Sequence, residues 1–181
     1  KIYARDFLTA NDLTQQLSKR VSFLGNPFMD KFSFLKKNLE KVPLNIGLFP
    51  GSRFPEIVDN LQLILEVLEK MSNLKYFENI DFKFAMVNSI SAGQIRQILN
   101  RRKWIYVDKI NKNNALEFKF GFITIIFNWN FFEEILFKSK FVISMAGTAT
   151  EQAIGLAKPV IQIEGKGPQF TKSFAEAQRR L

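Results

Sequence analysis

The chain has 181 residues and a net charge of +9, with 46% hydrophobic and 24% charged residues, a balance typical of a folded domain rather than a disordered chain. It contains no cysteine and no histidine, which excludes disulfides, Cys/His zinc sites, cysteine nucleophiles and Ser-His-Asp triads on this chain. The excess of basic residues suits a partner that carries phosphate, nucleic acid or anionic lipid, and it equally suits a solvated basic face.

The first 43 residues carry two helical patterns and one strand. Residues 6–20 predict a short amphipathic helix, with Thr9 or Asn11 as its cap. Residues 21–24 predict a strand, which the Gly-Asn-Pro sequence at 25–27 ends. Residues 31–41 predict a Lys-rich helix that leads into a linker.

From residue 44 onward, apolar strand patterns alternate with helical patterns, which predicts an α/β domain with a mainly parallel sheet. The predicted strands are 44–49, 82–87, 104–107, one or two strands within 118–127 that turn or bulge at Gly121, 141–145 and 160–163. The predicted helices start at Pro55, at Ser91 or Ala92, at Phe131, after a turn at 146–149, and at Thr171. The run LNIGLF at 44–49 is continuously apolar, as in a parallel strand that is buried on both faces.

The first candidate binding turn follows the strand at 44–49. Ligands of open α/β sheets bind beyond the carboxyl ends of the strands. Gly51 allows close approach of the backbone, Ser52 offers a hydroxyl that either caps the next helix or meets an oxygen, and Arg53 offers a planar fork suited to phosphate. An ordinary turn with a surface arginine explains the same residues.

The second candidate turn follows the strand at 141–145. The sequence GTATEQ places small residues at a helix start, where free backbone N–H groups favour an anion. In this interpretation, six consecutive residues bind the ligand: Gly147, Thr148, Ala149, Thr150, Glu151 and Gln152. Close packing of strand on helix, with a threonine cap, is the alternative.

Two further segments are weaker candidates. Phe127 and Trp129 lie in a sequence that we expect to form a loop, where their rings can stack on a base or pack into the core. Lys166 and Gln169 lie in a glycine-rich segment that either closes over a sugar or simply connects two elements.

Several of these segments resemble a known family. LFPGSRFPEI at 48–57 resembles the LPGSR-x-x-EI segment of lipid-A-disaccharide synthases, and MAGTATEQAIGLAKPVI at 145–161 resembles their SGTATLEA…KP segment. With GKGPQFTKSFAEAQRRL at 165–181, the chain looks closer still to lipid-A-disaccharide synthase-related proteins. FLTANDL and FLGNPFMD, at 7–13 and 23–30, resemble the join between the two domains of that group.

The resemblance implies a GT-B architecture, in which two Rossmann-like domains face a cleft. Residues 1–30 would be the tail of the first domain and the hinge. Residues 31–181 would be the second, nucleotide-sugar-binding domain, a mainly parallel sheet with helices on both faces, truncated at its C-terminal end. Since the chain starts with Lys1 and not with methionine, we expect a fragment or a processed product of a longer protein.

The resemblance also implies roles for matched residues. Arg53 matches the family's arginine on the diphosphate side of the cleft, and Gly147, Thr148 and Ala149 match the turn beneath the diphosphate. Gln152 stands where the synthases have their ribose-binding glutamate, and an acid, Glu151, precedes it. Because glutamine lacks charge, the nucleotide or sugar preference can differ from that of the synthases.

The implied reaction is inverting glycosyl transfer from a UDP-sugar, without metal or other cofactor, as in lipid A biosynthesis. The acceptor stays open, with a lipid-linked sugar as one option. The resemblance implies that the general base lies in the first domain. The acids of this chain agree with this, because the helix dipole favours the charged, weakly basic forms of Glu56 and Glu151. The positive charge of Lys166, close to Glu164 in sequence, would likewise lower the basicity of Glu164. We therefore expect this chain to bind a donor but not to turn it over alone.

The location implied is cytoplasmic, with peripheral contact to the inner face of the membrane as an option. No signal-peptide pattern is visible, and the longest apolar stretch, 120–127, is far short of the ~20 residues that a membrane span needs. A nucleotide-sugar 2-epimerase is one alternative function. A basic module for nucleic acid or anionic membrane is another, weakly supported by the basic residues at 101–103 and 179–180. Nucleic acid is not an expected partner.

Overall fold

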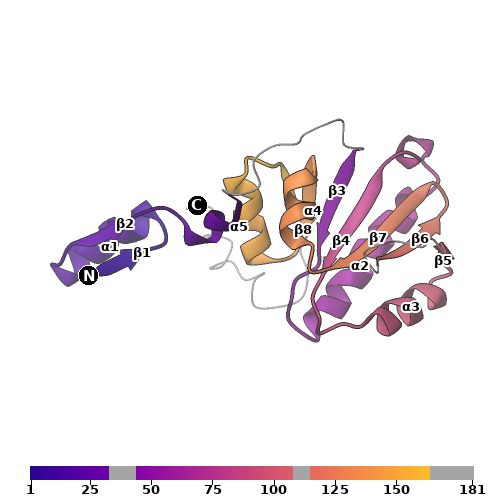
Figure 1. The fold of residues 1–181 in the computed structure, drawn as a ribbon, viewed down its shortest axis with the longest axis horizontal. Helices are drawn as coiled ribbons and strands as arrows, with labels where there is room; N and C mark the ends of the chain where they lie inside the picture. The colour runs from indigo at the N-terminus through magenta and orange to yellow at the C-terminus, as the bar shows by residue number, and fades with distance from the viewer. Residues whose placement is uncertain (33–43, 108–114, 164–181) are drawn as a thin grey trace.

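The computed structural model describes residues 1–32, 44–107 and 115–163 (Figure 1). Over these ranges the fold is α/β, with one seven-stranded mixed sheet and one small two-stranded parallel sheet. Most of the helix expected at 31–41, and both the loop and the helix expected after residue 164, lie outside the described residues. Glu164 and Gln169 lie there as well.

The N-terminal unit lies next to α5, and its two strands and first helix are apart from the large sheet (Figure 1). It consists of β1 (Ile2–Ala4), α1 (Phe7–Leu17), β2 (Val21–Phe23) and the 3₁₀ helix η1 (Pro27–Phe32). The strands β1 and β2 pair in parallel, with α1 as their crossover. The cap of α1 is Asp6, whose carboxylate accepts a 2.8 Å hydrogen bond from the Thr9 amide, so the expectation of Thr9 or Asn11 is wrong. The strand β1 was not predicted.

The large sheet has the strand order β5-β6-β7-β4-β3-β8-β9. Its strands are β3 (Asn45–Phe49), β4 (Asp81–Met86), β5 (Ile105–Val107), β6 (Leu116–Phe120), β7 (Ile123–Trp129), β8 (Phe141–Ser144) and β9 (Val160–Gln162). All neighbours pair in parallel except β6, which runs antiparallel to β5 and β7. The segment 118–127 thus forms parts of two strands, with Gly121 in the turn at a φ of 57°. The predicted parallel strands at 44–49 and 141–145 pair directly, with Ile46 opposite Phe141.

Helices cover both faces of this sheet, as predicted. They are α2 (Glu56–Met71), α3 (Ala92–Arg101), α4 (Phe132–Lys138) and α5 (Gly147–Gly155), with a short 3₁₀ helix η2 (Lys75–Phe77) after α2. The apolar faces of α2 and α3 pack on one side, while α4, α5 and Phe32 of η1 pack on the other. The turn expected at 146–149 is wrong, because α5 begins at Gly147, directly after its N-cap Ala146.

The alternation of side chains along β3 divides the core in two. Ile46 and Leu48 face α2, whereas Phe49 faces α4 and packs edge-on against Phe132. Between them, a Cβ added at Gly47 would lie 2.7 Å from the Ser139 hydroxyl. Both faces of β3 are therefore filled, which explains why its sequence is continuously apolar.

The path of the chain across the sheet reverses beside β3. From β3 the chain moves to β4 and later to β7 on one side, and it then returns to β8 and β9 on the other. Ligands of such sheets bind at the carboxyl ends of the strands where this reversal occurs. The fold thus points to the ends of β3 and β8.

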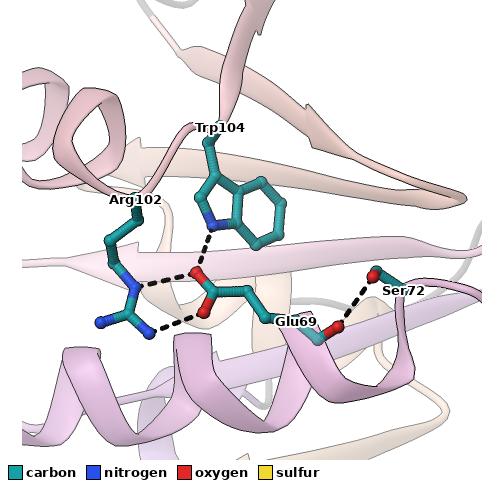
Figure 2. A network of polar contacts seen from close by, with 4 residues as sticks. All are labelled: Glu69, Ser72, Arg102 and Trp104. Atoms are coloured by element: carbon teal, nitrogen blue, oxygen red, sulfur yellow. Dashed lines mark hydrogen bonds and ion pairs between the residues drawn. The ribbon is translucent and has the colours of Figure 1, made fainter.

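A polar network ties the far end of α2 to α3 and β5 (Figure 2). The Glu69 carboxylate accepts hydrogen bonds from Arg102 at 2.8 and 2.7 Å and from the Trp104 indole at 2.8 Å. The hydroxyl of Ser72 donates to the Glu69 carbonyl, which closes the last turn of α2. Since α2 starts at the carboxyl edge of the sheet, this network lies at the opposite edge.

Candidate functional site

The two turns singled out in the sequence meet at one pocket. A cavity of about 290 Å³ lies between the ends of β3 and β8. Gly51, Ser52 and Arg53 line it from the first turn, and Ala146, Gly147 and Thr148 line it from the second. Residues almost 100 positions apart in sequence thus share one cavity at the reversal point of the sheet.

The first turn depends on its glycine. Gly51 has a φ of +108°, which residues with a side chain rarely adopt, although an added Cβ would meet only ordinary contacts. The side chains of Ser52 and Arg53 that follow are exposed. Ser52 does not cap α2, whose N-cap is Pro55 with no side-chain hydrogen bond. Both side chains are thus positioned to meet a ligand.

The second turn presents the start of α5. The Thr150 amide donates to the Ala146 carbonyl at 3.0 Å and closes the first turn. For the amides of Thr148 and Ala149, the described part of the chain provides no acceptor. Free N–H groups at a helix start, together with the helix dipole, favour an anionic group.

The two threonines of this turn differ in role. Thr148 is exposed and lines the cavity. Thr150 is buried, and its hydroxyl lies 2.8 Å from the Ala146 carbonyl and 3.0 Å from the Ser144 hydroxyl. The expectation that Thr150 offers its hydroxyl to a ligand is wrong, because β8 and the N-cap of α5 already occupy it.

Glu151 faces the cavity and is 8% exposed. Its Oε1 atom lies 3.2 Å from the Arg5 guanidinium, which reaches the cavity from the N-terminal unit. Burial raises the pKa of Glu151, and the charge of Arg5 opposes this shift without cancelling it. Our expectation of a weakly basic Glu151 is therefore wrong, because burial raises its pKa by more than the charge of Arg5 lowers it.

Gln152 is turned toward the N-terminal unit. Its side-chain amide donates a 2.8 Å hydrogen bond to the Phe28 carbonyl of η1, and the residue is buried. It borders a second cavity beside the first. The amide group thus joins α5 to η1, a role that the sequence did not predict.

This second cavity, of about 200 Å³, is largely apolar. It shares Gly51, Ser52 and Thr148 with the first cavity, and Phe49 and Phe132 add aromatic surface. Sequence reasoning missed Phe132, the first residue of α4. The signal was present, because Phe132 follows the carboxyl end of β7, to which the same rule for ligand sites applies.

Phe127 and Trp129 lie in β7 and not in a loop. Phe127 is 0% exposed and stacks on Phe84 at 4.5 Å between ring centroids, so its predicted contact with a ligand is wrong. Trp129 is half-buried, and its indole N–H donates to the Ile90 carbonyl at 2.9 Å. It lines an open groove at the carboxyl edge together with Asn88 and Asn130.

The three basic residues at 101–103 do not share one environment. Arg102 pairs with Glu69, and only Arg101 and Lys103 remain exposed. The other basic pair, 179–180, lies outside the described residues. A continuous basic surface is thus not formed by this run.

The described ranges contain no group of three or more Asp and Glu residues arranged to hold a metal ion. None of their helices combines the length and the apolar character that crossing a bilayer requires.

Neither a comparison with models of known protein families nor one with curated proteins found a match to this chain.

Proposed function

We propose that this chain is the nucleotide-sugar-binding part of an inverting, metal-independent glycosyltransferase with Rossmann-like domains in a GT-B arrangement. The observation that carries the proposal is the meeting of two segments, the turn 50–53 and the helix start 146–148, in one cavity. Their sequences resemble those of lipid-A-disaccharide synthases and related proteins. The strand order places the cavity where open α/β sheets bind nucleotides.

The diphosphate of a UDP-sugar fits the boundary between the two cavities. There Arg53 offers a charged donor, and the Thr148 and Ala149 amides offer neutral ones. Negative charge grows on the diphosphate as the glycosidic bond breaks, and donors fixed beforehand stabilise that charge. The apolar cavity beside Phe132 offers room for the uracil ring.

Residues 1–30 belong, in this proposal, to the first domain and the hinge. Exposed apolar side chains crowd the N-terminal unit, among them Tyr3, Phe7, Leu8 and Leu24. A parallel sheet is normally covered on both faces, so this surface suits packing against a further domain. Peripheral membrane contact is the alternative, and binding of the chain to anionic but not neutral vesicles would favour it.

The general base of the transfer is assigned to that first domain. The chain then binds the donor but does not turn it over. Burial raises the pKa of Glu151, which lines the cavity, so it is the residue to test. Turnover by the purified chain that disappears in Glu151→Gln would move the base onto this chain.

Titration calorimetry tests the proposal. We expect saturable binding of UDP and of at least one UDP-sugar, with weaker binding of uridine and of adenine nucleotides. Binding of nucleic acid with a steep salt dependence, and none of UDP, would contradict the transferase and favour the basic module. An epimerase would bind UDP as well, but it would also interconvert 2-epimers of the UDP-sugar.

A further inference from the structure

Three of the residues that line the first cavity each carry a buried side-chain oxygen to which no described group donates a hydrogen bond. Within the described chain, Glu56 Oε2, Asn60 Oδ1 and Glu151 Oε2 are all buried without a partner. All three residues line the same cavity. An unsatisfied buried polar atom costs about 1–3 kcal/mol, so a group of three in one cavity needs an explanation.

The protein holds these oxygens in place. Glu56 and Asn60 are four residues apart on α2 and therefore share one face of the helix. Asn60 is 0% exposed, and its side-chain nitrogen donates to the Pro50 carbonyl at 2.8 Å, which directs its oxygen away from that carbonyl. Arg5 holds one oxygen of Glu151 and leaves the other without a partner.

A carboxylate and an amide oxygen accept hydrogen bonds and donate none. A ligand group that satisfies these oxygens must therefore bring several donors. A divalent cation is disfavoured, because Arg5 already lies 3.2 Å from Glu151 and Arg53 lines the same cavity. Hydroxyl groups supply donors without adding positive charge.

We propose that Glu56, Asn60 and Glu151 bind hydroxyl groups of the donor sugar. This inference rests on the proposed function, which places the diphosphate at Arg53 on the border of the same cavity. The cavity then binds the sugar as well as the nucleotide. The chain binds a hydroxylated UDP-hexose more tightly than UDP.

The test compares affinities for UDP, UDP-glucose and UDP-N-acetylglucosamine, measured by calorimetry without metal. In Glu56→Ala and in Glu151→Ala, we expect affinity for the preferred UDP-hexose to fall about tenfold, as for a lost hydrogen bond to a charged group. Affinity for UDP should hold or rise, since a negative charge near the diphosphate is removed. The control Glu134→Ala, on the exposed face of α4, should change neither.

A second measurement leaves the protein unaltered and avoids variants that fold poorly. Analogues of the UDP-hexose that lack one hydroxyl should bind more weakly than the parent. The difference in affinity between each analogue and the parent should be smaller in a variant whose acid facing that hydroxyl has been replaced.

The outcomes separate the two proposals. If the unaltered chain does not bind UDP, the proposed function fails. If it binds UDP but no UDP-hexose more tightly, or if the acid variants change both affinities equally, only the sugar contact fails. A UDP-hexose affinity that requires Mg²⁺ and is lost with chelator would show a cation at these oxygens and would overturn the hydroxyl assignment.

Discussion

Arg53 and Glu151 line the same cavity but differ in their exposure to water. Arg53 is exposed, and its charge is solvated until a ligand arrives. Glu151 is buried, and its charge is opposed by desolvation and supported only by Arg5. The same cavity therefore pairs an accessible cation with a carboxylate that is partly deprived of water, and each residue leads to a separate measurement.

Replacement Arg53→Ala should weaken UDP binding about tenfold while affecting uridine little. Charge-assisted hydrogen bonds to phosphate contribute ~1.5–3 kcal/mol, and exposure places Arg53 at the lower end. Calorimetry with both ligands checks this. Arg101→Ala is the matched control, because it removes the same charge from the exposed end of α3, at the other edge of the sheet. An equal loss for UDP and uridine would show that Arg53 acts through the structure of the turn.

Replacement Glu151→Gln should change how stability depends on pH. The ordinary pKa of this carboxyl is 4.5, and burial raises it in the folded state. Above 4.5 the folded chain thus binds more protons at Glu151 than the unfolded chain does, so this residue lowers stability as pH rises toward its folded pKa. The unfolding free energy of Glu151→Gln relative to that of the unaltered chain should therefore increase as the pH rises above 4.5.

Urea denaturation at several pH values measures this effect. Glu134→Gln is the comparison, because Glu134 is exposed and pairs only with Lys138 one turn away. A difference between Glu151→Gln and the unaltered chain that stays constant across the pH range would contradict a raised pKa.

At the scale of elements, continuous or alternating apolar patterns predicted most strands and helices. β3 and β8 were predicted because both of their faces are buried, and α3 begins where a helix start was expected, at Ser91, whose side chain forms a capping box with Gln94. The pattern failed where tertiary contacts decide. β1 has three residues, which carry no period, and β7 extends past Phe127 because it pairs with β4 up to Trp129.

In the candidate site, too, the features set by local sequence could be predicted, and those set by tertiary contacts could not. The segments 50–53 and 146–149 could be located from the sequence, because glycine and small residues at strand ends have a local meaning, although the second segment is the start of α5 and not a turn. The contact of Gln152 with Phe28, across 124 positions, could not. Neither could the Arg5–Glu151 pair, since both depend on how the N-terminal unit packs against α5.

The network around Glu69 should matter for stability and not for ligand binding. Burial alone would raise the pKa of Glu69, but the hydrogen bonds from Arg102 and Trp104 outweigh it and leave the pKa lowered. Its stabilising contribution is then present above the ordinary value of 4.5 and is lost as pH falls below it. We expect Glu69→Gln to lower the free energy of unfolding at neutral pH by about 1–3 kcal/mol.

Chemical denaturation measures that loss, and calorimetry with UDP should show unchanged affinity. Glu66→Gln, on an exposed position of the same helix, should cost little. A loss of UDP affinity in folded Glu69→Gln would mean that the two edges of the sheet are coupled.

At the scale of the whole molecule, the proposed function depends on where the chain reverses across its sheet. That reversal brings β3 and β8 together, and with them two turns that resemble glycosyltransferase segments. The N-terminal unit adds Arg5 to the same cavity, where its ion pair with Glu151 joins this unit to α5.

Amide NMR spectra of the chain, titrated with UDP, test the central claim most directly. We predict saturable shifts that are largest for residues 51–53 and 147–149, with little change at Arg101 and Lys103 at the opposite edge of the sheet. Shifts centred on the basic run at 101–103, or no shift at millimolar UDP, would contradict a diphosphate site between β3 and β8.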